Sequence, residues 1–145
     1  MEYTIRDMTV DDIDEIISLG KGVSELLASS TDEFWSEDVL RGWVEAGQDI
    51  MLVAESGGNV VGFQLTQLHV PSKSGYLSDI AIHPEFRRHG IATRLIEEAL
   101  ERMKQQGMTY VYGLTKVNNQ NIHKLLQRLD FQQGDAFYWF DKQLS

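Results

Sequence analysis

The sequence predicts one mixed α+β domain spanning residues 1–145, and three observations lead to this class. The chain of 145 residues has the length of an ordinary domain. Its 42% hydrophobic and 24% charged residues are typical of a globular protein. Helical patterns come first, a run of strand patterns follows, and strands then alternate with helices. This order of elements is typical of a central sheet flanked by helices.

The N-terminal third is predicted to form a short strand followed by helices. Residues 2–6 can form the strand, and Asp11 or Asp12 can cap the helix that follows it. Ser36 has the position of a second helix cap, and Gly47 has the position at which that helix ends. The first third of the chain therefore contributes mainly helices.

The middle of the chain is predicted to form three strands. Residues 50–55 and 60–68 are expected to pair as a hairpin across the Ser-Gly-Gly-Asn turn at 56–59. Residues 76–82 form a third apolar strand, which ends before Pro84.

The last third is predicted to continue as helix, strand, helix and strand. The clearest helix of the sequence ends at Gly107, and its apolar face consists of Ile91, Leu95, Ile96, Ala99, Leu100 and Met103. A strand is expected at 109–115, and Asn118 or Asn119 can cap the next helix. The aromatic tail at 131–144 is expected to be rich in strand.

Composition excludes several classes of function. The formal net charge of −9 disfavours nucleic acid as a partner and modestly favours cationic substrates such as amines. The chain has no cysteine, and its four histidines lack the spacing of a zinc motif, so no metal site is expected. No apolar stretch is long enough for a membrane span and the first residues lack a leader pattern, so we expect no membrane partner and a cytoplasmic location.

A local basic island, Arg87-Arg88-His89, lies where a strand is followed by a turn and then by the long helix that begins near Gly90. Helix N-termini present unsatisfied backbone N–H groups and the positive end of the helix dipole, which suit a phosphate group. Gly90 would let the backbone approach that phosphate closely. A solvated loop is the alternative reading of the same residues, and the flanking strand and helix favour the phosphate site.

The run from Asp79 to Ala92 resembles the acetyl-CoA signature of the GCN5-related N-acetyltransferase (GNAT) family, Gln/Arg-x-x-Gly-x-Gly/Ala after an apolar strand. Asn119, Ile122 and the later Phe131 resemble a second motif of that family. The resemblance covers the whole chain and implies a mostly antiparallel, splayed sheet. It also implies that the chain binds acetyl-CoA and transfers acetyl to a small-molecule or peptide amine. The implied cofactor-binding residues are Ile80, Ala81, Ile82, Arg87, Arg88, His89, Gly90, Ile91, Ala92, Thr93 and Asn119. Homodimers are common in the family, so a homodimer is a further expectation.

The catalytic residues follow less directly from the resemblance. Many relatives carry a tyrosine acid where this chain has Leu126, and the subgroup that acetylates ribosomal-protein N-termini carries a glutamate base where it has Leu114. The candidates that remain are Tyr76, Ser78, Asp79, His123 and Tyr138. Tyr76 and Ser78 are expected to share one face of their strand. His123 is expected either to face the cofactor thiol or to face solvent, and Asp79 is either a base or a hydrogen-bonding partner.

Phe34 and Trp35 lie in the segment that often lines the acceptor pocket of this family. They can cage a cationic amine or belong to the core. The function expected from the sequence is direct N-acetyl transfer from acetyl-CoA. The alternatives are a CoA-binding regulatory domain with weakened catalysis, which the absent tyrosine favours, and a structural domain without a cofactor.

Overall fold

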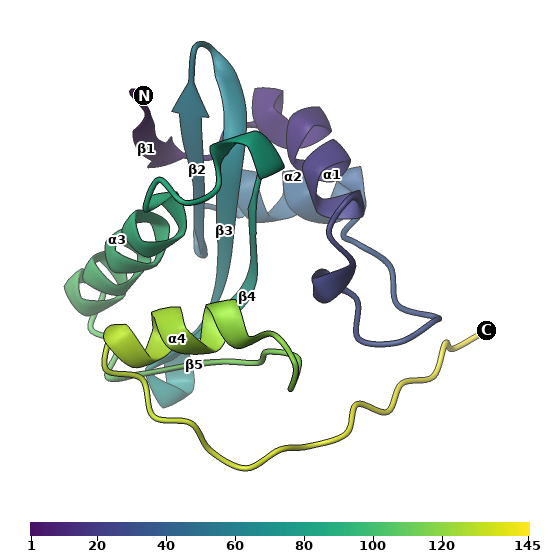
Figure 1. The fold of residues 1–145 in the computed structure, drawn as a ribbon. Helices are drawn as coiled ribbons and strands as arrows, with labels where there is room; N and C mark the ends of the chain where they lie inside the picture. Colours follow the sequence, from purple (N-terminus) through teal and green to yellow (C-terminus); the bar gives the residue numbers. More distant parts are fainter.

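The computed structural model describes all of residues 1–145 and shows a five-stranded sheet with helices on both faces (Figure 1). The strands are β1 (Thr4–Asp7), β2 (Ile50–Ser56), β3 (Asn59–His69), β4 (Ser74–Ile82) and β5 (Tyr110–Gly113). The helices are α1 (Ile13–Lys21), α2 (Glu37–Ala46), α3 (Ile91–Gln105) and α4 (Gln120–Arg128). Short 3₁₀ turns occupy Val10–Asp12, Ser24–Leu26, Val70–Ser72 and Pro84–Phe86. The mixed α+β class and the mostly antiparallel sheet expected from the sequence are confirmed.

The strands are arranged in the order β1-β2-β3-β4-β5, and each is the neighbour of the strand before it in the sequence. The first three pairs are antiparallel, and the β2–β3 hairpin turns at Gly57 and Gly58 as predicted. The last pair, β4 with β5, is parallel because α3 carries the chain back across the sheet between them.

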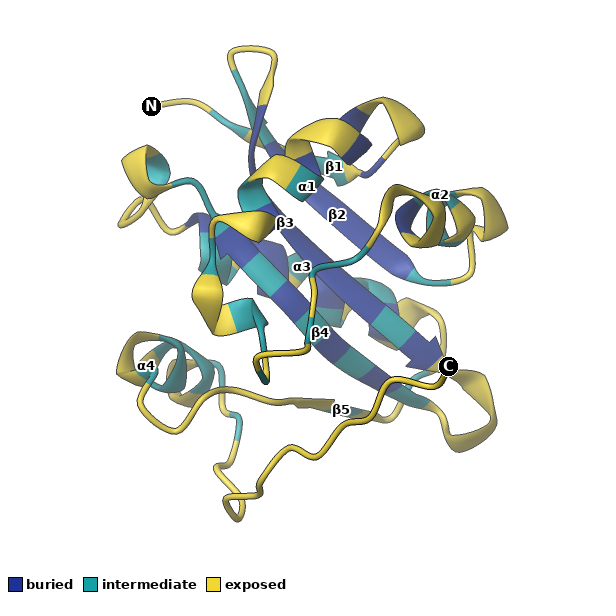
Figure 2. Cartoon of the chain, turned by 90° about the vertical axis from the view of Figure 1, so that its right-hand side faces the viewer, coloured by how far each residue is buried: buried dark blue, intermediate teal, exposed yellow.

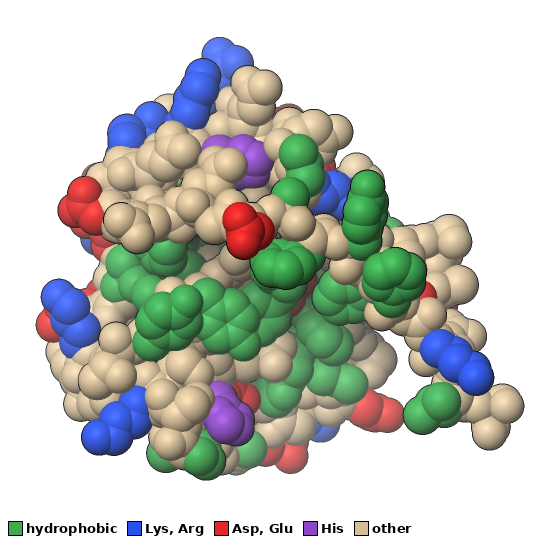
Figure 3. Space-filling model, turned by 90° about the horizontal axis from the view of Figure 1, so that it is seen from below, with side chains coloured by type: hydrophobic (Ala, Val, Ile, Leu, Met, Phe, Trp, Pro, Cys, Tyr) green, Lys and Arg blue, Asp and Glu red, His purple; other side chains and the backbone are tan.

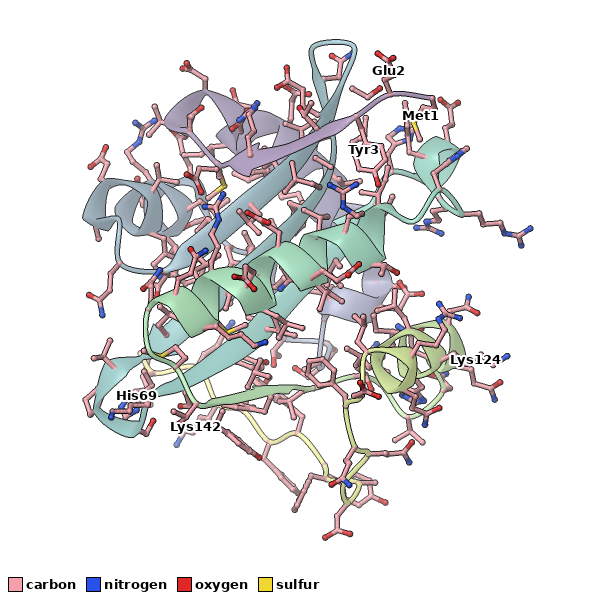
Figure 4. The ribbon with its side chains drawn as sticks, turned by 90° about the vertical axis from the view of Figure 1, so that its left-hand side faces the viewer. Met1, Glu2, Tyr3, His69, Lys124 and Lys142 are labelled. Atoms are coloured by element: carbon pink, nitrogen blue, oxygen red, sulfur yellow. The ribbon has the colours of Figure 1, made fainter.

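Two hydrophobic cores lie on the two faces of the sheet. The core under α3 joins Leu95, Ile96 and Ala99 to apolar side chains of β2 and β3, and α4 packs at its edge through Leu125 and Leu126. The core under α1 and α2 contains Phe63, Leu65 and further buried residues of β2 and β3. Figure 2 shows these strands as the most continuously buried part of the chain beneath α1 and α2. Helix α3 lies across the opposite face (Figure 4).

The caps expected at Ser36, Gly47 and Asn119 are confirmed, whereas Asp12 precedes α1 without a side-chain hydrogen bond to that helix. The Ser36 side chain accepts a hydrogen bond from Val39 N, and Gly47 ends α2 in the left-handed conformation. Asn119 caps α4 by accepting a hydrogen bond from Ile122 N at 3.4 Å. Each cap satisfies a backbone group that the helix alone leaves free.

The prediction of a strand-rich tail at 131–144 is wrong, because residues 131–145 form no helix or strand. Aromatic side chains favour strands only where a neighbouring strand accepts the backbone hydrogen bonds and a core covers one face. The tail pairs with no edge of the sheet. Phe131 packs partly buried against the core under α3, whereas the aromatic side chains at 137–140 lie exposed. It is anchored by side chains instead, since Asp141 accepts hydrogen bonds from Ser29 Oγ at 2.5 Å and Thr31 Oγ1 at 2.9 Å.

None of the helices combines the length and the apolar character that crossing a membrane requires.

Candidate functional site

A β-bulge in β4 determines which side chains of this strand lie together. Asp79 pairs with Leu65 and Leu77 pairs with Thr66, so Ser78 has no partner in β3. The Ser78 hydroxyl donates a hydrogen bond to the Leu65 carbonyl at 3.1 Å. A bulge adds one residue to one strand and reverses the alternation of side chains beyond it.

The bulge adds Asp79 to the face of β4 that carries Tyr76. Leu77 packs in the core under α3, whereas Ala81, four residues later, packs in the core under α1 and α2. Gly75 contacts Met103 of α3, so Tyr76 points to the opposite face. Asp79 bonds to Trp35, in the segment before α2, and therefore lies on that same face. The bulge thus brings Asp79 onto the face of Tyr76, and the Ser78 side chain hydrogen-bonds to Asp79 as well.

Asp79 is a buried carboxylate with one strong hydrogen bond. Its exposed fraction is 8%, and Trp35 Nε1 donates to Asp79 Oδ2 at 2.7 Å. The Trp35 ring packs edge-on against Trp43 at 5.0 Å between ring centroids, which holds the donor in place. Burial raises the pKa of Asp79, hydrogen bonds from Trp35 and Ser78 lower it, and the negative charge of Asp32 raises it, with a net increase. A raised pKa makes this carboxylate a stronger base than an exposed aspartate.

Tyr76 lies half-buried beside this carboxylate. Its ring stacks on Tyr112 of β5 with 5.0 Å between centroids and 15° between planes. Burial raises the pKa of the Tyr76 phenol, and the negative charge of Asp79 raises it further. Tyr76 is therefore a neutral hydrogen-bond donor at physiological pH.

Beyond the first part of β4, the outer edge of the strand has no neighbour. Parallel pairing with β5 starts at Ser74–Tyr110 and ends at Leu77–Gly113, and no strand pairs with that edge over residues 78–82. In Figure 1, β5 crosses the lower end of β4 instead of following its whole length. The backbone groups along this edge, which include those of Ile80 and Ala81, are not paired with a strand and could pair with an extended ligand, and at Ile82 the carbonyl accepts a hydrogen bond from Arg87 Nε.

The loop between β4 and α3 presents a group of free backbone donors. Arg88 and Gly90 both adopt left-handed conformations, with φ of 67° and 77°, and α3 begins at Ile91. None of the backbone N–H groups of residues 88–93 donates to a backbone carbonyl. A Cβ atom built on Gly90 would meet nothing within 4 Å, so the surface beside Gly90 itself is open. An anionic group fits here, because it would satisfy these donors at the positive end of the α3 dipole.

The side chains of this loop are the expected basic ones. Arg88 and His89 lie exposed, and Arg87 is held by a hydrogen bond from its Nε to the Ile82 carbonyl at 3.2 Å. Ile91 is buried in the core under α3, so only its backbone can take part in binding, whereas Ala92 and Thr93 are partly exposed. The loop therefore offers backbone donors together with fixed positive charge.

The other candidate acids and bases lie elsewhere. His123 Nε2 is 2.8 Å from Thr115 Oγ1 and 3.0 Å from the Lys116 carbonyl, so this nitrogen is engaged by the loop before α4. Tyr138 belongs to the tail, is 91% exposed and lies outside the sheet that carries Tyr76 and Asp79. We therefore set aside the expectation that Tyr138 is a catalytic acid on a C-terminal strand.

The two leucines that replace family residues have different environments. Leu126 packs partly buried against the core under α3, whereas Leu114 follows β5 and is exposed. Neither side chain can supply an acid or a base. Three of the candidate acids and bases, Tyr76, Ser78 and Asp79, lie on β4.

Sequence reasoning missed the hydrogen bond between Trp35 and Asp79. It considered Trp35 and Phe34 either as an amine cage or as core, and both pack partly buried against the core under α1 and α2. The indole N–H nevertheless reaches the carboxylate across 44 positions of sequence. No local spacing pattern connects two residues so far apart.

Two surface hollows lie away from Tyr76 and Asp79. One, of about 660 Å³, lies between α1 and the loop that starts at His83. The other, of about 560 Å³, is lined by the first residues of the chain and by Arg94. Figure 4 shows Met1, Glu2 and Tyr3 beside the N-terminal end of α3, where Arg94 lies over the Tyr3 ring at 5.9 Å from its centroid. Neither hollow is lined by a residue of β4.

Comparisons with known proteins agree with this geometry. The sequence model of the Acetyltransferase (GNAT) family matches residues 20–131. An uncharacterised N-acetyltransferase of Methanocaldococcus jannaschii is 27% identical over 143 residues, which cover 92% of this chain and 62% of that protein. The chain thus spans less than two thirds of the length of that relative.

Two further similarities support the same grouping. An N-alpha-acetyltransferase of Sulfurisphaera tokodaii is 28% identical over 143 residues, which cover 91% of this chain and 81% of that protein. The crystal structure of the PaiA N-acetyltransferase from Thermoplasma acidophilum, in complex with coenzyme A, superposes with a TM-score of 0.82 at 16% identity and covers 94% of each chain. The similarity in structure extends across the sheet and its helices, and the family model spans both the open β4 edge and the loop before α3. The chain belongs to the acetyltransferase (GNAT) family.

Proposed function

We propose that the protein transfers an acetyl group from acetyl-CoA directly to a primary amine of a small molecule or peptide. The observation that carries this proposal is the sequence of features along β4. A buried carboxylate, Asp79, lies at the start of an open strand edge, and that edge leads to the free backbone donors of residues 88–93. Amine acetylation requires a base, a binding edge for the donor and a site for its phosphates, and these features supply them in that order.

We assign the diphosphate of acetyl-CoA to the loop before α3 and its pantetheine arm to the open edge of β4. The loop contributes Arg87, Arg88, His89, Gly90, Ile91, Ala92 and Thr93, and the edge contributes Ile80, Ala81 and Ile82. Asn119 uses its Oδ1 to cap α4, which leaves its Nδ2 group available to a ligand. The coenzyme A complex of the Thermoplasma acidophilum protein, which has the same fold, supports coenzyme A as the group to be placed here.

The proton transfers are assigned to the two side chains that the bulge brings together. An aliphatic amine is protonated at neutral pH and must lose a proton before its nitrogen can attack, and Asp79 is our candidate acceptor for it. When bound, acetyl-CoA supplies a thioester, whose C–S bond breaks as the C–N bond to the amine forms. The nitrogen then loses a second proton to solvent. Tyr76, a neutral phenol, is our candidate donor of the proton that the departing sulfur takes up, and solvent reprotonates it.

The test is an acetyl-transfer assay with purified protein, acetyl-CoA and a panel of primary amines and peptides. We expect free thiol to appear together with acetylated amine, at a rate that depends on both substrates. Spontaneous hydrolysis of acetyl-CoA is controlled by leaving out the amine. Failure of every amine in the panel would contradict the proposal.

A CoA-binding protein with weakened catalysis is the second candidate. It is favoured by Leu126, which packs partly buried where many relatives carry a tyrosine acid and which cannot donate a proton. This alternative predicts that acetyl-CoA raises the melting temperature while no amine is acetylated. The first proposal predicts both the thermal shift and turnover. Measuring the two on the same preparation separates the candidates.

A further inference from the structure

Two stretches of the chain carry most of its exposed apolar surface. Of the thirteen large hydrophobic residues that lie exposed, nine fall within residues 110–117 and 137–144: Tyr110, Tyr112, Leu114, Val117, Phe137, Tyr138, Trp139, Phe140 and Leu144. Figure 3 views the molecule from below and shows hydrophobic side chains gathered on this side. Single apolar residues are normal on a protein surface, whereas a concentration of them indicates a contact site.

The first stretch contains a free sheet edge. β5 is the last strand of the sheet, so its edge turned away from β4 pairs with no strand. Tyr110, Tyr112 and Gly113 are exposed, so no other element covers this edge. The outer strand on the opposite side, β1, carries the charged residues Arg6 and Asp7, which disfavour pairing with another chain. β5 carries no charged residue and lacks this protection.

The second stretch has the composition of a strand but no partner. Residues 136–140, Ala-Phe-Tyr-Trp-Phe, are called the aromatic segment here. Aromatic residues favour strands where a sheet edge is available for pairing. No backbone group of residues 132–145 bonds to another backbone group. The aromatic segment and the β5 edge therefore both present backbone donors and acceptors that no strand has paired.

The aromatic segment does not lie on the β5 edge of its own chain. Residues 131–145 contain no turn that would bring the segment back to β5, and Figure 1 shows the tail leading from the end of α4 to the side of the molecule that carries α1. Asp141 holds the tail there, because it accepts hydrogen bonds from Ser29 Oγ, Thr31 Oγ1 and Trp139 Nε1. The β5 edge is thus left free for the tail of another molecule.

We propose that the aromatic segment of one copy of this chain pairs with the β5 edge of a second copy, and that the reciprocal pairing closes a homodimer. Each five-stranded sheet gains one strand from its partner, and the two contacts are identical by symmetry. This inference does not rest on the proposed acetyl transfer, because it uses no residue assigned to catalysis or to coenzyme A.

The charge of the chain favours a contact between copies at these two segments. Two copies with a formal net charge of −9 each repel one another over most of their surfaces. Residues 105–115 and 136–140 contain no charged side chain, so the two segments can meet without that repulsion. In an added strand, Phe137 and Trp139 lie on one face and Tyr138 and Phe140 on the other, so each face presents two rings to the neighbouring strand.

A pair of lysine substitutions tests the aromatic segment, with a matched pair elsewhere as the control. Tyr138→Lys with Phe140→Lys changes the segment, and Val39→Lys with Val70→Lys changes two exposed apolar residues of α2 and of the turn before β4. Both pairs add two positive charges, so they lower the general repulsion between copies equally. Sedimentation over a range of concentrations should show a wild-type dimer, a dimer Kd raised about tenfold or more by the first pair and little change from the second. A wild type that stays monomeric, or a dimer that the first pair leaves unchanged, would overturn the inference.

Thiol cross-linking distinguishes pairing between copies from pairing within one chain. The chain has no cysteine, so an introduced thiol is unique. A mixture of Tyr110→Cys and Tyr138→Cys proteins, treated with a short bismaleimide, should give a covalent dimer that contains one of each. Val39→Cys in place of Tyr138→Cys should give far less. A chain that carries both Tyr110→Cys and Tyr138→Cys and is cross-linked only within itself, as a monomer, would show that the tail returns to its own β5 and would overturn the inference.

Discussion

Replacement of Asp79 by Asn separates catalysis from folding at this site. Asparagine has nearly the same size and keeps an Oδ1 acceptor for Trp35 Nε1, which now donates at 2.7 Å. The change therefore preserves the packing and one hydrogen bond, and it removes only the negative charge. If Asp79 accepts the proton of the amine, its loss should reduce kcat/KM about 10²- to 10⁴-fold, the usual contribution of a general base.

The same variant should not be less stable at neutral pH. Burial raises the pKa of Asp79 in the folded state above that of the unfolded chain, so the folded state binds this proton more tightly. The free energy of unfolding of the wild type therefore decreases as the pH rises from the unfolded pKa through the folded pKa. Above that range the wild type carries a buried charge that Asp79→Asn lacks, so the variant is expected to be as stable as the wild type or more stable.

Two measurements check this prediction. A pH profile of kcat/KM reports the activity, and urea unfolding near neutral and at mildly acidic pH reports the stability. Asp135→Asn, an exposed aspartate of the tail, serves as the matched control and should change neither. An Asp79→Asn variant with wild-type kcat/KM would refute the role of base. A variant that unfolds far more easily at neutral pH would refute the argument about the buried charge.

Three further predictions test other parts of the structure. Gly90→Ala and Gly107→Ala each force alanine into a left-handed conformation, at φ of 77° and 82°, and each should cost about 1 kcal/mol. Only Gly90→Ala should raise KM for acetyl-CoA, and equal KM values would contradict the loop assignment. Trp35→Phe removes the donor that lowers the pKa of Asp79, so the acidic limb of the pH profile should move to higher pH, and an unmoved limb would argue against this hydrogen bond. Thr66 Oγ1 is fully buried without a partner, so Thr66→Val should raise the free energy of unfolding by about 1–3 kcal/mol in urea titrations; a loss would indicate a missed partner.

Much of the fold follows from local sequence patterns. The α3 helix carries its apolar residues at helical spacing, and five of them, Ile91, Leu95, Ile96, Ala99 and Met103, are buried against the sheet. Ser36 and Asn119 cap the helices that they were expected to cap, because a short polar side chain just before an amphipathic run can accept a hydrogen bond from a free backbone N–H group of the first turn. The family resemblance of residues 79–92 is confirmed by the match of the family model.

The errors come from contacts between distant segments. The bulge at Ser78 depends on the register of β4 against β3, and a regular alternation of side chains along β4 cannot reveal it. The bulge decides that Tyr76 and Asp79 share a face. The prediction of strands in the tail was wrong for a related reason, since an aromatic pattern favours a strand only where the edge of a sheet is available for pairing.

The roles of individual residues stay predictions. The roles proposed for Tyr76 and Asp79 rest on where the two side chains lie on β4. Trp35, Asp32 and Tyr112 enter the site through tertiary contacts, which explains why no motif pointed to them. Arg87 through Thr93 could be proposed from the sequence alone, because a phosphate site at a helix N-terminus is local in the chain.

The central claim is that this chain moves acetyl from acetyl-CoA to an amine at the open edge of β4. The most direct test incubates the wild-type protein with isotopically labelled acetyl-CoA and a panel of primary amines and peptides, and quantifies free thiol and labelled N-acetylated product in the same samples. The account predicts that, with an accepted amine, the two products appear in equal amounts and that Asp79→Asn suppresses both. Thiol release without any labelled N-acetylated product, or no release with any member of the panel, would contradict it.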